Sequence, residues 1–148
     1  MKRLIPGLVV LLAGCATAPS EPALIKVTQS GAPEATFRNA KAADIQAKFA
    51  NNCLAHGMTL EDISPLQVTC VREVPDGHEA IDVMVLIGTT SGGRLPYYEK
   101  VDFTTLQVGP DVHIVAHSFL IEGKRRVAYM PHLVQNAIQK SFTVLGAE

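Results

Sequence analysis

Two histidines lie four residues apart, a spacing that binds metal when the segment is helical. His113 and His117 belong to the segment VHIVAHSFLI, residues 112–121, which is rich in β-branched residues and therefore favours a strand. On a strand, residues four apart are separated by about 13 Å, whereas zinc binds each ligand at about 2 Å. The glutamate of an H-E-x-x-H motif is also missing. The sequence therefore predicts two histidines on a partly exposed sheet face, and no metal site.

Other arrangements that support catalysis are incomplete. The segment GTTSGG, residues 88–93, has neither the G-x-S-x-G pattern of a nucleophile elbow nor the Gly-Lys-Ser/Thr end of a phosphate loop. The aspartates and glutamates show no pairing that sequence alone makes catalytic. The short basic run Lys124–Arg126 is typical of a solvated turn. We therefore expect a protein that is not an enzyme and uses no cofactor.

Cys15 ends a segment typical of an export signal. Residues 1–15 read MKRLIPGLVVLLAGC, with Lys2 and Arg3 followed by an apolar stretch of about ten residues. Spanning a bilayer takes about 20 residues, so a signal peptide is favoured over a transmembrane helix. The last four residues, LAGC, resemble the lipobox of bacterial lipoproteins. The resemblance implies removal of residues 1–14 by signal peptidase II and acylation of Cys15.

The resemblance also implies a location. Two or more acyl chains anchor a protein stably, so a triacylated Cys15 would hold the chain on a membrane without a spanning helix. Ala16 follows the cysteine, where enterobacterial lipoproteins retained at the inner membrane commonly carry aspartate. The implied site is the outer membrane, with the domain facing the periplasm. Loss of Lys2 and Arg3 leaves 11 basic and 14 acidic residues, which gives no basic surface for nucleic acid.

The elements that position the remaining residues begin after a tether. Prolines and small residues mark residues 15–36 as the lipidated N-terminus and a flexible tether, and the domain is expected over residues 37–148. Within the tether, Ala23–Val27 (ALIKV) is apolar; it either docks on the domain as an edge strand or strap, or belongs to the linker. Asn39–His56 is the clearest helix, with apolar residues four apart, Asn39 as a possible N-cap and Gly57 after its end.

Alternating residues predict four strands and a second helix. The strands are expected at residues 66–74, 80–88, 97–108 and 112–122, with a turn at 59–65 and a short extended piece at 125–130. A change of parity near Thr104–Thr105 predicts a bulge. From Pro131 the spacing becomes helical. Tight turns favour an antiparallel four-stranded sheet in the order helix-β-β-β-β-helix, with both helices on one face: an α+β two-layer sandwich.

The two other cysteines are expected to meet in the core. Cys53 lies on the apolar face of the first helix and Cys70 on the apolar face of the first strand. If Cys15 is lipidated, the domain is in an oxidising compartment, and a Cys53–Cys70 disulfide is sterically reasonable. The alternative is two buried thiols; a redox pair would use a Cys-x-x-Cys motif, which is absent.

The sheet face away from the helices carries apolar residues where a polar surface is usual. They are Met84, Leu86, Val115, Phe119 and Ile121. They are candidates for contact with a partner protein, a second copy of the chain or the Ala23–Val27 segment; the alternative is that they are central residues of a slightly thicker fold.

The favoured function is that of a lipid-anchored periplasmic accessory or assembly protein of the cell envelope. It would bind a partner protein, or itself, through its sheet face or edge. The composition, with 47% hydrophobic residues in 148, fits one folded domain after the tether. An alternative is a binder of a small apolar ligand or a peptidoglycan fragment in the groove between sheet and helices, which a deep apolar pocket would favour. An envelope hydrolase is the least favoured class.

Overall fold

A computed structural model describes residues 22–74, 97–128 and 131–148. Within these ranges the chain forms six strands and two helices. They are β1 (Glu34–Phe37), α1 (Ala42–Ala55), β2 (Thr59–Ile63), β3 (Gln67–Glu73), β4 (Tyr97–Val108), β5 (Asp111–Glu122), β6 (Arg125–Ala128) and α3 (His132–Val144).

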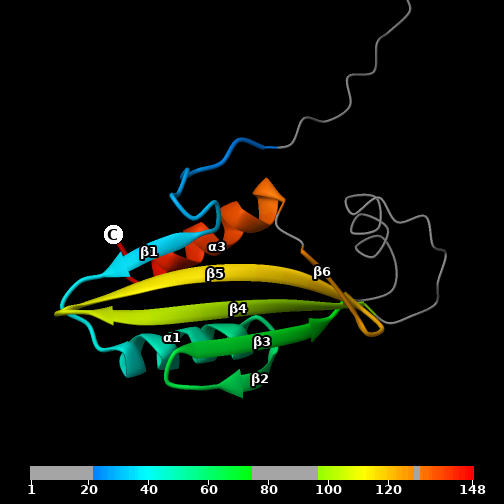
Figure 1. Ribbon diagram of the computed structural model, residues 1–148, viewed down its shortest axis with the longest axis horizontal. Coiled ribbons are helices and arrows are strands. Elements are labelled where there is room, and N and C mark those ends of the chain that lie inside the picture. Colours follow the sequence, from blue (N-terminus) through cyan, green and yellow to red (C-terminus); the bar gives the residue numbers. More distant parts are fainter. Residues whose placement is uncertain (1–21, 75–96, 129–130) are drawn as a thin grey trace, which may run out of the picture.

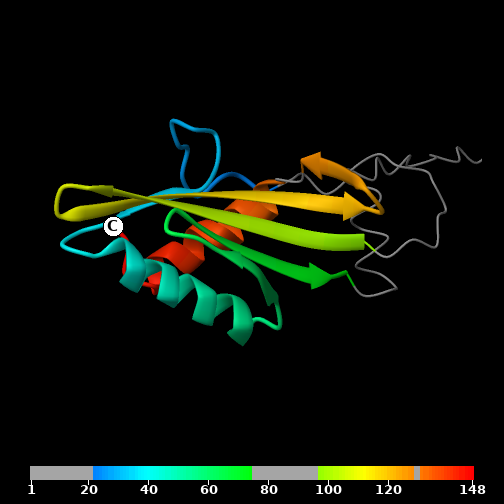
Figure 2. The ribbon, with the colours of Figure 1, turned by 60° about the horizontal axis from the view of Figure 1, so that its bottom comes forward.

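The strands form one antiparallel sheet in the order β1-β5-β4-β3-β2. Strand β6 also pairs with β5, at the end of β5 that β1 does not reach. Figures 1 and 2 show α1 and α3 packed on the same face of this sheet. The predicted α+β class, with an antiparallel sheet and two helices, is therefore confirmed. The predicted count of four strands is wrong, because the described residues alone form six.

Two strands lie where the sequence indicated a tether and a turn. Glu34–Phe37 pairs with β5 as β1, and its Ala35 and Phe37 are buried, so the folded part begins before Phe37. Thr59–Ile63 pairs with β3 as β2, with a register shift between Leu60 and Asp62. Most of β2 is exposed at the sheet edge, and the shift interrupts any alternation, so no periodic apolar pattern marks it.

The other strands follow the sequence closely, with one correction. The predictions for 66–74, 97–108 and 112–122 correspond to β3, β4 and β5. The predicted bulge at Thr104–Thr105 is wrong, because the pairing of β4 with β5 runs without a register shift through both residues. Leu106 and Val108 are each 55% exposed, so the change of parity reflects apolar residues on the surface. The predicted strand at 80–88 lies outside the described residues.

The backbone conformations of the flanking residues set the two ends of helix α1. Lys41, in an extended conformation, is its N-cap, whereas Asn39 has a positive φ of 50° and lies outside the helix. At the other end Gly57 has a φ of 72°, and its N–H donates to the Leu54 carbonyl while the Met58 N–H donates to the Cys53 carbonyl. These two bonds are a Schellman motif, which favours glycine at that position.

Four phenylalanines form the centre of the core between the sheet and the helices. Phe49 of α1 is fully buried, and its ring centroid lies 4.7 Å from Phe103 of β4, 5.5 Å from Phe142 of α3 and 6.0 Å from Phe37 of β1. The distances and the edge-on or tilted ring angles are those that aromatic pairs prefer. This cluster holds both helices on the sheet.

Candidate functional site: a groove between the helices and the sheet

A pocket of about 380 Å³ opens on the helix-covered side of the molecule. It lies between the C-terminal part of α1, strands β3 and β4, and α3. Its lining residues are Asn52, Cys53, His56, Met58, Arg72, Glu99, Val101, Phe103, Leu133, Val134, Ala137, Ile138 and Ser141. We call this pocket the groove.

The inner walls of the groove are apolar. Val101 and Phe103 lie on the face of β4 that points to the helices, and both are buried. The Schellman motif at the end of α1 turns the chain so that Met58 packs against the core beside Cys53. A ligand in the groove would therefore meet apolar side chains from α1 and from the sheet.

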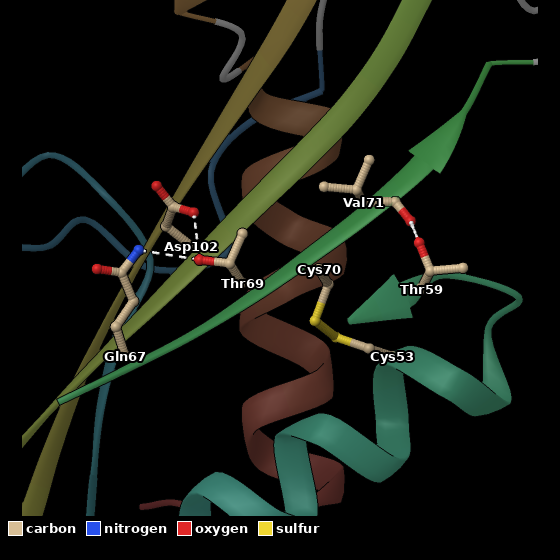
Figure 3. The surroundings of a disulfide bond; sticks show 7 residues. All are labelled: Cys53, Thr59, Gln67, Thr69, Cys70, Val71 and Asp102. Carbon is tan, nitrogen blue, oxygen red and sulfur yellow. Dashed lines mark hydrogen bonds between the residues drawn. A yellow bond between two sulfur atoms is a disulfide. The ribbon is translucent and has the colours of Figure 1, made fainter. Parts of the chain in front are cut away.

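A disulfide fixes the α1 wall to the sheet. Cys53 of α1 and Cys70 of β3 are bonded, with their Cα atoms 6.2 Å apart. Figure 3 shows the two sulfur atoms joining the end of α1 to β3. The predicted pairing of Cys53 with Cys70 is thus confirmed. The bond limits how far α1 can move toward the groove.

Helix α3 forms the opposite wall. Val134, Ile138 and Ser141 follow one another at helical spacing along this wall, and Ala137 lies between them on the same face. Leu133, which also lines the groove, is 65% exposed.

A different face of α3 holds the N-terminal segment. The Asn136 side-chain amide donates to the Ala23 carbonyl and accepts from the Ile25 N–H, both at 2.8 Å. A nitrogen of His132 lies 3.0 Å from the Pro22 carbonyl oxygen. Ala23 and Ile25, in the apolar part of the expected tether, therefore lie against α3 rather than in the groove.

One ion pair lies at the mouth of the groove. The Arg72 Nε donates to Glu99 Oε2 at 2.6 Å, between β3 and β4. The Arg72 side chain is 45% exposed, whereas that of Glu99 is 13% exposed. The charge that faces solvent at this end is therefore mainly the guanidinium.

The other face of the sheet carries a polar network. Thr69 of β3 donates to one carboxylate oxygen of Asp102 on β4, and Arg126 of β6 donates to the other, each at 3.0 Å. Figure 3 shows Gln67, Thr69 and Asp102 joined in sequence beside the disulfide. The guanidinium carbon of Arg126 lies 3.3 Å from the centre of the Phe119 ring. This network covers part of the face that the sequence indicated as apolar.

The predicted partner-contact residues fall into two groups. Val115, Phe119 and Ile121 lie together on this second face of β5 and are half-buried. Met84 and Leu86 lie outside the described residues, as does Cys15. His113 and His117 are on β5, as expected of a strand, and His113 lies 3.4 Å from the Thr36 hydroxyl. Among the described residues no cluster of histidine, cysteine and carboxylate side chains is suited to a metal ion.

One carboxylate near β1 has a shifted pKa. The Ser30 hydroxyl donates to Glu34 at 2.7 Å, and this bond lowers the pKa of the Glu34 carboxyl below its ordinary value. The backbone N–H of Gln29 donates to the other carboxylate oxygen. The two hydrogen bonds tie Glu34 to the turn that precedes β1, and Glu34 does not line the groove.

The lining of the groove was not identified from sequence, although a sheet–helix groove was among the alternatives. Periodicity assigns Cys53, Val101 and Ile138 to the core, and it carries no information about the space left between them. The exposed Leu133 next to buried positions of α3 is the one local signal.

The chain has no match among protein-family models, and no curated protein matches it significantly. In the part of the chain that the structure describes, no helix has the length and apolar character needed to cross a bilayer.

Proposed function

We propose that the chain is a lipid-anchored protein of the bacterial outer membrane whose periplasmic domain binds a small, largely apolar ligand in the groove. The observation that carries the proposal is a hollow of about 380 Å³ with apolar inner walls. Ligand pockets are typically about 300–1,000 Å³ and mainly apolar, with a few polar groups that orient the ligand. The groove has both properties.

The apolar walls favour an apolar ligand over a peptidoglycan fragment. Burying sugar hydroxyls and peptide amides without hydrogen-bond partners costs free energy. Five of the thirteen described lining residues are polar, and two of these, His56 and Arg72, are exposed. In this proposal the domain binds and carries the ligand, and it catalyses no reaction.

Binding is tested with the mature chain from residue 15, carrying Cys15→Ser so that no detergent is needed. The neutral apolar dye N-phenyl-1-naphthylamine is added and its fluorescence followed. Ala137→Phe would fill the groove, and we expect it to weaken dye binding at least about tenfold, which corresponds to about 1.4 kcal/mol. Ala47→Phe is the matched control, because Ala47 is also an exposed alanine on a helix but does not line the groove. No dye binding by the parent chain, or equal binding by both variants, would contradict the proposal.

The lipid anchor is tested separately in cells. The full-length chain should incorporate labelled palmitate and fractionate with the outer membrane, and Cys15→Ser should lose both properties. Incorporation of label by the Cys15→Ser variant would show that Cys15 is not the anchor.

A second candidate function is docking of a protein on the open sheet face, the simplest partner being a second copy. It is favoured by the row of Val115, Phe119 and Ile121, which lies on the face away from α1 and α3 and is only half-buried. Phe119→Asp would then abolish self-association measured by analytical ultracentrifugation. A monomeric parent chain would contradict this candidate.

A further inference from the structure

We infer that the ligand of the groove is a single-chain amphiphile with an anionic head group, and that Arg72 binds the head. This inference rests on the proposed function and specifies its ligand. It follows from the orientation of one side chain, the size of the groove and the distribution of charge at its mouth.

The guanidinium of Arg72 is oriented but not saturated. Glu99 accepts from its Nε atom alone, and the two remaining guanidinium nitrogens have no partner among the described residues. Arginine binds carboxylates and phosphates through pairs of parallel N–H bonds, so the unused nitrogens are suited to a second anion. Glu99 holds the side chain in place and thereby reduces the entropy lost when a ligand binds.

The charge at the mouth favours an anion over a cation. Among the described residues that line the groove, Glu99 is the only carboxylate; it is largely buried and already paired with Arg72. The exposed group of that pair is the guanidinium. An incoming ammonium would have to displace Arg72 from Glu99, whereas an incoming carboxylate adds to the free side of Arg72.

The volume favours one acyl chain. An apolar cavity of about 150 Å³ holds benzene, which has six carbons, so by proportion about 380 Å³ holds roughly 15 carbons. Two chains of a phospholipid would not fit. Leu133 and Val134 of α3 and Val101 of β4 line the groove and would contact the carbons of such a chain.

The test compares three probes that share a twelve-carbon chain: laurate, 1-dodecanol and dodecylammonium. Binding to the mature Cys15→Ser chain is measured by displacement of the neutral dye, below the micelle concentration of each probe. We expect laurate to bind about tenfold more tightly than dodecanol, and dodecylammonium to bind no better than dodecanol.

Arg72→Gln should remove the preference for laurate, so that laurate and dodecanol bind about equally. Circular dichroism of the variant checks separately that the domain is still folded. Arg38→Gln is the matched control, because Arg38 pairs with Glu148 through the same nitrogen, Nε, but lies outside the groove. It should bind all three probes as the parent does. Arg72→Lys keeps the charge and loses the paired N–H groups, so it should keep part of the preference.

The outcomes separate the inference from the function on which it rests. Equal binding of laurate and dodecanol by the parent chain, or an unchanged preference in Arg72→Gln, would overturn the role of Arg72 and leave apolar binding in place. Tighter binding of dodecylammonium than of dodecanol would show that the head group is not anionic and that Glu99 binds it. If the parent chain does not bind the dye, the proposed function fails as well.

Discussion

The two faces of the sheet hold their aromatic side chains in different ways. On the helix-covered face Phe49 is fully buried among three other phenylalanines, and the Cys53–Cys70 bond ties α1 to the sheet beside them. On the open face Phe119 is half-buried, and the Arg126 guanidinium lies over its ring.

The difference explains where a ligand has room. On the open face the Arg126 side chain lies over the Phe119 ring, so apolar area there is reduced without a second layer. On the other face two rigid helices must cover the sheet, and where α1 and α3 diverge a hollow with fixed walls remains.

The largest expected difference between the two faces is in how much the free energy of unfolding falls when one aromatic ring is removed. Phe49→Ala should lower the free energy of unfolding by about 3–5 kcal/mol, because it leaves a cavity in a closely packed core. Phe119→Ala should cost about 1 kcal/mol, because its ring is only partly removed from water. Urea denaturation followed by circular dichroism measures both values. Similar losses at the two sites would show that the open face is as tightly packed as the core.

The disulfide should have the next largest effect. The double variant Cys53→Ala, Cys70→Ala removes a cross-link over 17 residues and should lower the free energy of unfolding by about 3 kcal/mol. The same variant should bind the dye more weakly, because the α1 wall of the groove is no longer tied to β3. Unchanged stability and unchanged dye affinity would show that the disulfide stabilises neither the domain nor the groove.

The ion pair on the open face should contribute less. Asp102 and Arg126 interact at 3.0 Å, but the Arg126 side chain is 53% exposed and its charge is screened by water. A double-mutant cycle with Asp102→Asn and Arg126→Gln should give a coupling free energy below about 1 kcal/mol, and less in high salt. A coupling of several kcal/mol that is insensitive to salt would indicate that this face is shielded from water.

The smallest expected effect is a dependence on pH near β1. The pKa of Glu34 is lowered in the folded state, so its contribution to stability is present at neutral pH and is lost as the pH falls through the lowered folded-state value. Ser30→Ala removes the hydrogen bond that causes the shift and should reduce this loss. Thermal unfolding between pH 7 and pH 3 of the parent and Ser30→Ala compares the two; identical profiles would show that the Ser30 bond does not matter.

The strands and helices with strong periodicity were predictable. Helix α1 has Ile45, Phe49 and Cys53 on one buried face, and β5 alternates along its length, so local sequence was sufficient for both. The same buried positions of Cys53 and Cys70 allowed the disulfide to be predicted. Strand β2 was missed, because an exposed edge strand with a bulge shows no alternation of apolar residues.

The groove was predictable only in general terms. Its lining comes from α1, β3, β4 and α3, which are far apart in the sequence, and its volume depends on how the two helices are placed. The pairing of Arg72 with Glu99 depends on the register between β3 and β4, in which these residues are direct neighbours. Periodicity within one segment specifies neither of these relations.

The most direct test of the account is a titration of the methyl-labelled mature Cys15→Ser chain with laurate, followed by NMR. We expect the methyl signals of the groove residues Val101, Val134 and Ile138 to shift and to saturate together, while those of Val115 and Ile121 on the open face stay in place. Shifts confined to Val115 and Ile121, or the absence of any saturable shift, would contradict the assignment of the groove as the binding site.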